Sequence, residues 1–205
     1  MSHKILITGA TGHIGKKLIP ALLKNNYKLV CIYNKKLPFC KKNKNIEWLK
    51  CDLKNSKIPL KKNTNFYSTI HLAGLTNGAS NIDREYFSAN EQTLINTLDS
   101  VKNKTHKFIF ISSQAVYGNP NSKKVDEGFE LQSNFNSYSL SKINCEKWLE
   151  YYQKQFTGMY FSLRFTGFIG GGGNIDHIID CAKNNRDIVL FSKGNICRDY
   201  ISFEY

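Results

Sequence analysis

Apolar and polar positions along the chain alternate in blocks that predict strands and helices in turn. A short apolar run over residues 4–8 is followed by a glycine-containing turn over 9–15. Residues 16–24 then place their apolar side chains three and four positions apart, as on one face of a helix, and 28–33 is a second apolar run. A strand, a tight turn, a helix and a strand in this order form one βαβ unit.

The alternation continues along the rest of the chain. Further strands are expected over 46–49, 68–73, 107–112 and 159–165, and further helices over 83–101, 138–156 and 175–183. Because strands that alternate with helices pair through crossovers, we predict an α/β fold in which a doubly wound parallel sheet has helices on both faces.

Length and composition fit this fold and exclude several other classes of protein. The chain has 205 residues, of which 41% are hydrophobic and 22% charged, so it can build a core and is not a disordered chain. No run approaches the ~18 consecutive apolar residues of a membrane span. The chain also enters its first strand too early for a secretion signal. We therefore predict a cytoplasmic protein that makes no membrane contact.

The large positive charge does not by itself indicate a nucleic-acid-binding protein. The formal net charge is +13, from 29 lysines and arginines against 16 acidic residues. Only four of the basic residues are arginines, and arginine is the side chain that reads guanine and phosphate with paired hydrogen bonds. We expect a solvated lysine-rich surface. A nucleic-acid-binding module, whose binding would fall steeply with salt, is the weaker alternative.

The six cysteines give no sign of a metal site or of a redox pair. None belongs to a CxxC pair, and none stands at metal-ligand spacing from the five histidines. Several lie inside apolar runs, as Cys31 does. We expect buried free thiols in a reducing compartment and no bound metal.

The turn over residues 9–15 carries the first candidate chemistry. Gly9, Gly12 and Gly15 follow a strand and precede a helix. Glycines let the backbone approach a pyrophosphate closely, and the helix N-terminus offers free N–H groups and the positive end of a dipole. In this context the pattern predicts a dinucleotide site, although a turn that needs glycine for structure alone has the same pattern.

Ser113, Tyr138 and Lys142 form the second candidate set. Tyr138 and Lys142 are four residues apart in a predicted helix, so they share one face. A nearby cation lowers the pKa of a tyrosine from about 10 and makes it a usable acid or base. Ser113 follows a strand at the carboxyl edge, where open α/β sheets bind ligands. A tyrosine alone on a helix face is more often a packing residue, whereas the three residues in this context predict catalysis.

Together these motifs resemble those of the short-chain dehydrogenase/reductase superfamily, in particular its extended branch, whose members modify nucleotide-activated sugars. The matching segments are, in chain order, Ile7–Gly15, Cys51–Leu53, His71–Gly74, Asn90 with Thr93, Ile111–Gly118, Tyr138 with Lys142, Leu163–Arg164 and Arg198–Ile201. They occur in the order typical of the family and extend over nearly the whole chain.

The resemblance implies where a nicotinamide dinucleotide binds. The glycine turn would hold the pyrophosphate, Asp52 and Leu53 would border the adenine, and residues 72–74 would line the path to the nicotinamide. The residues implied in cofactor binding are Gly9, Thr11, Gly12, His13, Ile14, Gly15, Asn34, Lys35, Lys36, Asp52, Leu53, Leu72, Ala73, Gly74, Asn90 and Lys142.

The resemblance also implies a chemistry. Tyr138 would be the acid–base group on a sugar hydroxyl or keto oxygen, Lys142 would bind the nicotinamide ribose and lower the pKa of Tyr138, and Ser113 would hydrogen-bond the reacting oxygen. The residues expected to contact the nucleotide-sugar substrate are Thr76, Gln114, Tyr138 and Arg198. A homodimer that pairs through the helices after Asn90 and after Tyr138 is implied as well.

Departures from the family's pattern narrow the activity. The 4,6-dehydratases carry an Asp-Glu pair directly after the catalytic Ser or Thr, where this chain has Gln114 and Ala115. Dehydration is therefore disfavoured, and epimerase and keto-reductase activities both stay open. Asn34, Lys35 and Lys36 stand where members that use NAD place an acid. Two cations suit a 2′-phosphate, so NADP(H) is favoured and NAD(H) stays open.

The same resemblance sets the expected domain boundaries. Residues 1–165 are expected to form the dinucleotide-binding Rossmann domain, and 166–205 the start of an incomplete substrate-binding region. Family members continue past the segment at Arg198 into a C-terminal lobe, so we expect this lobe to be absent or truncated here. Gly167 stands where relatives often carry an asparagine that contacts the substrate diphosphate.

A second class of function uses the same fold, namely a dinucleotide-sensing regulatory protein without turnover. Such proteins typically lose the Ser, Tyr and Lys set that this chain keeps, so an NAD(P)-dependent sugar epimerase or oxidoreductase in surface-polysaccharide synthesis is favoured. Replacing Tyr138 by Phe would preserve cofactor binding in both cases and abolish turnover only in the enzyme.

Overall fold

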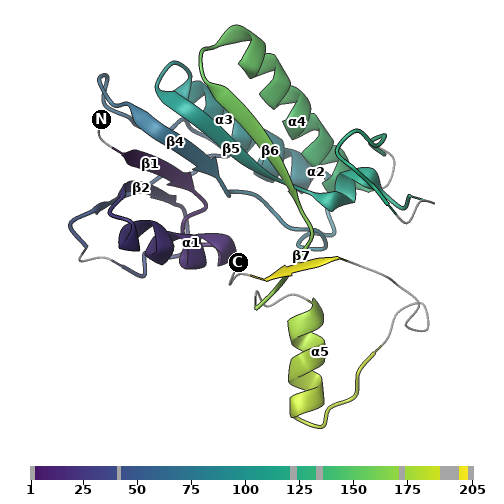
Figure 1. Cartoon of the computed structure of the whole chain (residues 1–205). Helices are drawn as coiled ribbons and strands as arrows, with labels where there is room; N and C mark the ends of the chain where they lie inside the picture. The colour runs from purple at the N-terminus through teal and green to yellow at the C-terminus, as the bar shows by residue number, and fades with distance from the viewer. Residues whose placement is uncertain are drawn as a thin grey trace. The chain divides into compact units, whose positions relative to one another are not determined.

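A six-stranded sheet lies at the centre of the larger of the two units into which the chain divides, Met1–Arg164 (Figure 1). Its strands are, in spatial order, β3 (Ile46–Lys50), β2 (Lys28–Tyr33), β1 (Lys4–Thr8), β4 (Phe66–His71), β5 (Thr105–Ser113) and β6 (Met159–Phe165). The pairs β1–β2, β1–β4, β2–β3 and β4–β5 are parallel. The strand order reverses between β1 and β4, which is where open sheets of this kind bind ligands.

Helices cover both faces of this sheet, as the sequence predicts. Helix α1 (His13–Lys24) lies on one face, and α2 (Asp83–Tyr86), α3 (Gln92–Val101) and α4 (Ser137–Gln155) lie on the other (Figure 1). Neighbouring residues of one strand serve the two layers: Ile7 packs in the cluster with α1, and Leu6 in the cluster with α3 and α4. Strands buried on both faces appear in sequence as continuous apolar runs. The predicted doubly wound fold is confirmed.

The computed structural model describes residues 3–40, 43–120, 124–132, 136–170, 174–189 and 199–202. In these ranges, no group of three or more His, Cys, Asp or Glu side chains is placed to hold a metal ion. No helix formed by these residues has the length and apolar character that a membrane crossing requires.

The helix predicted over 83–101 contains a turn that the sequence periodicity does not reveal. A π-helical turn, η1 (Phe87–Glu91), connects α2 to α3. A π turn inserts one residue into the helical repeat and often occurs at functional sites. Asn90 lies in this turn with 1% of its surface exposed.

The second unit, Phe165–Tyr205, contains two short elements besides a helix. Strands β7 (Gly167–Ile169) and β8 (Tyr200–Ser202) pair in parallel, and α5 (Asn174–Lys183) lies between them in sequence. A Cβ atom at Gly167 would lie 2.8 Å from the ring of Tyr200, so this ring fills the space of a side chain. The substrate-binding role expected of 166–205 stays a prediction.

Candidate active site

The turn after β1 is shaped by contacts that only glycine allows. Gly9 has a φ of +61°, and a Cβ atom there would lie 2.7 Å from backbone atoms of Leu72 and Ala73. A Cβ atom at Gly15 would collide with the carbonyl oxygen of Ala10. The backbone after β1 therefore runs directly against the end of β4, and α1 starts close to the turn.

The N-terminus of α1 can accept an anion. Its N-cap residue is Gly12, no side chain among the described residues caps it, and its first turn has no acidic residue. Backbone N–H groups at such a helix end bind phosphate together with the helix dipole. Thr11 is buried beside the turn, Ile14 is half-buried and His13 is exposed. The close backbone approach and the open helix end both fit a dinucleotide pyrophosphate.

The loop after β4 is fastened to helix α4 through Asn90. Its side-chain oxygen accepts a hydrogen bond from Leu75 N (2.7 Å), and its Nδ2 donates to Ser141 Oγ (2.9 Å). A Cβ atom at Gly74 would lie 2.6 Å from that oxygen, so glycine is required for this contact. Since both ends of its amide are engaged, Asn90 positions the loop, and the cofactor contact expected of it stays a prediction. Thr76 is exposed further along the loop.

The residues expected near the adenine lie at the ends of β2 and β3. Asn34 Nδ2 donates to Asp52 Oδ1 (3.1 Å), which connects the two strand ends. Lys35 and Lys36 are exposed beside them. Leu53 is 5% exposed and packs in the core cluster that includes α3 and α4. Asn34 and the two lysines are thus accessible, whereas Leu53 contributes mainly to the core.

Ser113, Tyr138 and Lys142 meet at the carboxyl end of β5. Ser113 is the last residue of that strand, and Tyr138 lies in the first turn of α4. The phenol of Tyr138 is hydrogen-bonded to Ser113. The residues that begin α4 fix its start, because Asn136 Oδ1 accepts from Ser139 N (2.7 Å) and Ser139 Oγ accepts from Asn136 N (3.2 Å).

Lys142 is held in an apolar and largely buried environment. Its Nζ donates to the carbonyl oxygen of Ile111 (2.8 Å) and lies 4.7 Å from the ring centre of Phe110 and 5.9 Å from that of Tyr138. Burial lowers the pKa of Lys142 to about 8, although the neighbouring Cys145 and Glu146 act in the opposite direction. The amine is therefore a cation at neutral pH and loses its proton in moderately alkaline solution.

The pKa of Tyr138 is raised, which corrects the expectation of a lowered value. Burial is the largest cause, and the hydrogen bond with Ser113 opposes it. The amine of Lys142 is hydrogen-bonded to Ile111 O and not to the phenol, and the effect of burial on the phenol is the larger one. Tyr138 is therefore protonated at neutral pH and can donate a proton or a hydrogen bond.

His71 is buried behind these groups as a neutral imidazole. Its Nδ1 lies 2.9 Å from Thr8 Oγ1, and its ring stacks on Phe108 with the ring centres 6.3 Å apart. Burial, with the positive charge of Lys142, lowers the pKa of His71 to about 3. This histidine keeps the region under the catalytic set free of a second positive charge.

Glu146 and Gln114 lie next to the catalytic set, and no role of Glu146 is predicted from the sequence. Glu146 lies one helical turn after Lys142 and pairs with Arg164 of β6 (2.7 Å). The spacing of Tyr138, Lys142 and Glu146 in steps of four residues is the signal that could have identified Glu146. Gln114 is half-buried in a 3-10 turn, η2 (Gln114–Tyr117), directly after Ser113. The predicted substrate residue Arg198 lies outside the described residues.

Comparison with known proteins gives one family. A model of the NAD dependent epimerase/dehydratase family matches residues 5–204. The chain is 28% identical over 214 residues to a candidate UDP-glucose 4-epimerase of Methanocaldococcus jannaschii, which covers 96% of this chain and 68% of that protein. It is 31% identical over 164 residues to a UDP-glucose 4-epimerase of Pisum sativum, which covers 71% of this chain.

Solved structures agree with these sequence matches. The crystal structure of UDP-glucuronic acid 4-epimerase from Bacillus cereus in complex with NAD superposes with a TM-score of 0.85 at 26% identity. The match covers 98% of this chain and 69% of that one. The chain spans less than half of the Pisum sativum enzyme, 46% of its length.

Proposed function

Because the chain belongs to the NAD dependent epimerase/dehydratase family, we propose that it catalyses the 4-epimerisation of a nucleotide-activated sugar with Tyr138 as the acid–base group. The observation that carries the proposal is the convergence of Ser113, Tyr138 and Lys142 beside the end of β5. Relatives named as UDP-sugar 4-epimerases support the choice of substrate class.

The chain's own residues would hold the cofactor by backbone contacts. Gly9, Gly12 and Gly15 let the turn pack tightly on its own backbone and on the end of β4, and the N-terminus of α1 that follows would hold the pyrophosphate. Leu72 and Ala73 line the neighbouring end of β4, and Asn90 fixes the loop that follows. A bound nicotinamide supplies the hydride acceptor and donor.

Tyr138 would exchange a proton with the sugar hydroxyl while Ser113 and Lys142 orient and stabilise it. Ser113 is hydrogen-bonded to the phenol and lowers its pKa against the effect of burial. The positive charge of Lys142, 5.9 Å from the ring of Tyr138, favours the phenolate when the proton leaves. Gln114 and Ala115 do not titrate, so no group beside Ser113 can assist the loss of water.

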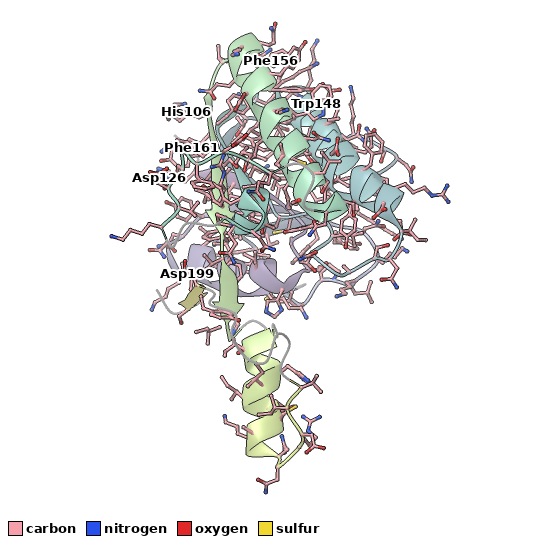
Figure 2. All side chains as sticks on the ribbon, turned by 90° about the vertical axis from the view of Figure 1, so that its right-hand side faces the viewer. His106, Asp126, Trp148, Phe156, Phe161 and Asp199 are labelled. Carbon is pink, nitrogen blue, oxygen red and sulfur yellow. The ribbon has the colours of Figure 1, made fainter. Side chains whose placement is uncertain are left out.

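We extend the proposal to substrate contacts and to a homodimer. Substrate contacts from Thr76, Gln114, Tyr138 and Arg198 stay proposals, since the chain spans only part of its relatives. For the dimer, helix α4 carries the exposed apolar side chains Leu140, Trp148 and Tyr151, with Trp148 labelled in Figure 2. Apolar side chains at this spacing form one stripe on a helix, which is typical of a helix-pairing surface.

A keto-reductase is the second candidate, and one observation favours it. Lys35 and Lys36 are exposed after β2, where two cations suit the 2′-phosphate of NADP(H), the cofactor that reductases typically consume. Calorimetric titration with NADPH and NADH in parallel tests this preference. Tighter binding of NADPH, lost in Lys35→Ala/Lys36→Ala, supports it; equal binding contradicts it.

The proposed activity is tested by incubating the purified chain with NAD and UDP-galactose, UDP-glucuronate or UDP-N-acetylglucosamine. An epimerase interconverts the C4 epimers, visible by proton NMR, with no net change in NADH absorbance. Net oxidation of NADPH with a 4-keto sugar instead indicates a reductase. Tight dinucleotide binding with neither reaction favours a regulatory protein on the same fold.

A further inference from the structure

The segment between Ser113 and α4 folds back on the turn η2. Gln132 N donates to Val116 O (2.8 Å), and Asn119 N donates to the side-chain oxygen of Gln132 (3.3 Å). The rings of Tyr117 and Phe129 meet edge to face, with their centres 6.2 Å apart. The parts of this segment that the structure describes are therefore attached to the chain directly after Ser113.

The side chain of Arg164 connects this segment to strand β6. Arg164, near the end of β6, donates from NH1 to the hydroxyl of Tyr117 (2.8 Å) and to the carbonyl oxygen of Glu127 (2.9 Å). Asp126, beside Glu127, marks this loop in Figure 2. Arg164 thus holds both η2 and the loop around residue 127.

The other side of the same guanidinium binds helix α4. Nε and NH2 of Arg164 donate to the carboxylate of Glu146, at 3.1 Å to Oε1 and 2.7 Å to Oε2. Ser162 Oγ donates to Oε1 as well (3.0 Å). The side chains of Glu146 and Arg164 are 7% and 19% exposed, so a two-point ion pair is held away from water in one geometry.

Glu146 also acts on the catalytic lysine. It lies four residues after Lys142 and eight after Tyr138, so the three side chains emerge along one side of α4. Its negative charge raises the pKa of Lys142 against the effect of burial. One carboxylate thus supports the charge of Lys142 and anchors Arg164.

We propose that Glu146 and Arg164 are positioning residues, which fix the segment after Ser113 against α4 and so hold Ser113 in register with Tyr138. If Arg164 and Glu146 served packing alone, the ion pair between them would be sufficient, and buried ion pairs contribute little net stability. The two bonds from NH1 go instead to the segment that separates the catalytic residues. This inference rests on the proposed function for its effect on turnover.

The test compares three variants of the full chain. Arg164→Lys keeps the charge opposite Glu146 but lacks the planar fork that reaches three partners. Tyr117→Phe removes one bond from NH1 and leaves the ion pair intact, so it keeps the test open if Arg164→Lys does not fold. Arg84→Lys makes the same substitution at an exposed arginine of α2 and is the matched control.

Hydrogen exchange and kinetics are measured on each variant. We expect faster amide exchange over residues 113–120 and 124–132 in Arg164→Lys and, to a smaller degree, in Tyr117→Phe. We also expect kcat for epimerisation to fall by about 10- to 100-fold in Arg164→Lys, with a smaller change in KM, because small misplacements of reacting groups are costly. The control should match the wild type in both readouts.

Unchanged exchange over residues 113–120 and 124–132, or a lower melting temperature with unchanged kcat, would overturn the proposal. If the wild type does not epimerise any nucleotide sugar, the proposed function fails, and a difference titration against Tyr138→Phe then decides the positioning role. Since the Ser113 bond lowers the pKa of Tyr138, loosening it in Arg164→Lys should raise that pKa. An identical titration in wild type and variant would overturn the inference in that case too.

Discussion

The glycine turn after β1 and the Ser113–Tyr138–Lys142 set both lie at the carboxyl edge of the sheet, yet different forces hold them in place. The turn is defined by backbone sterics among residues close in sequence, where Gly9 and Gly15 admit no Cβ atom. The catalytic set depends on side chains from β5, η1 and α4 that meet through buried hydrogen bonds. The first arrangement can be deduced from a local motif, whereas the second requires the tertiary fold.

The largest expected effect comes from adding one methyl group to the turn. Gly9→Ala places a Cβ atom against Leu72 and Ala73 and also forces alanine into a positive φ. Gly78→Ala is the matched control, since Gly78 has a φ of +74° and nothing within 4 Å of the added atom. We expect the control to lose about 1–2 kcal/mol of unfolding free energy and Gly9→Ala to lose clearly more, together with NAD binding.

Thermal melts and calorimetric titration with NAD measure both effects. Equal destabilisation of the two variants would mean that only the backbone angle matters, and the steric account of the turn would be wrong.

For the set of Ser113, Tyr138 and Lys142, we expect instead that activity depends on pH. The pKa of Lys142 lies at about 8 and that of Tyr138 is raised, so above pH 8 the amine loses the charge that favours the phenolate. We expect kcat for epimerisation to fall as the pH rises through 8, by about tenfold for each further unit. A pH–rate profile with constant kcat up to pH 9.5 would contradict this coupling.

Removing the side chain that connects the loop after β4 to helix α4 should have a moderate effect on stability. Asn90→Ala removes the acceptor for Leu75 N and the donor to Ser141 Oγ, so we expect a loss of about 1–3 kcal/mol in unfolding free energy and weaker NAD binding. Asn25→Ala, which removes an exposed bond to Ala21 O, should change stability by less than about 0.5 kcal/mol. Equal losses of unfolding free energy in urea unfolding of the two variants would show that the buried hydrogen bonds of Asn90 do not stabilise the fold more than an exposed one.

The smallest effect concerns acid stability. The pKa of His71 is lowered from its usual 6.5 to about 3, so the unfolded chain binds this proton first. The contribution of His71 to stability is complete above pH 6.5 and is lost as the pH falls towards 3. We expect His71→Leu to flatten the decline of the melting temperature between pH 6.5 and 4.5. His106→Leu, at an exposed position of β5 that is labelled in Figure 2, is the control for the removal of one histidine. A slope that His71→Leu does not alter would contradict the neutral buried form.

The sequence predicts the fold well because each parallel strand is buried on both faces and appears as an apolar run. It does not predict η1, η2 or β7, since these short elements depend on contacts with distant segments. The glycine turn and the pair Tyr138 and Lys142 follow from local spacing. The bond of Lys142 to Ile111 O depends on the tertiary fold, and the raised pKa of Tyr138 follows from burial; a linear pattern reveals neither of them.

The most direct test of the account is turnover by Tyr138→Phe in the presence of NAD and a UDP-sugar. Tyr67→Phe, a change at an exposed tyrosine of β4, is the control. The account predicts that Tyr138→Phe binds NAD as the wild type does and loses at least about 100-fold in kcat, while the control keeps full activity. Wild-type turnover in Tyr138→Phe would show that the acid–base group lies elsewhere.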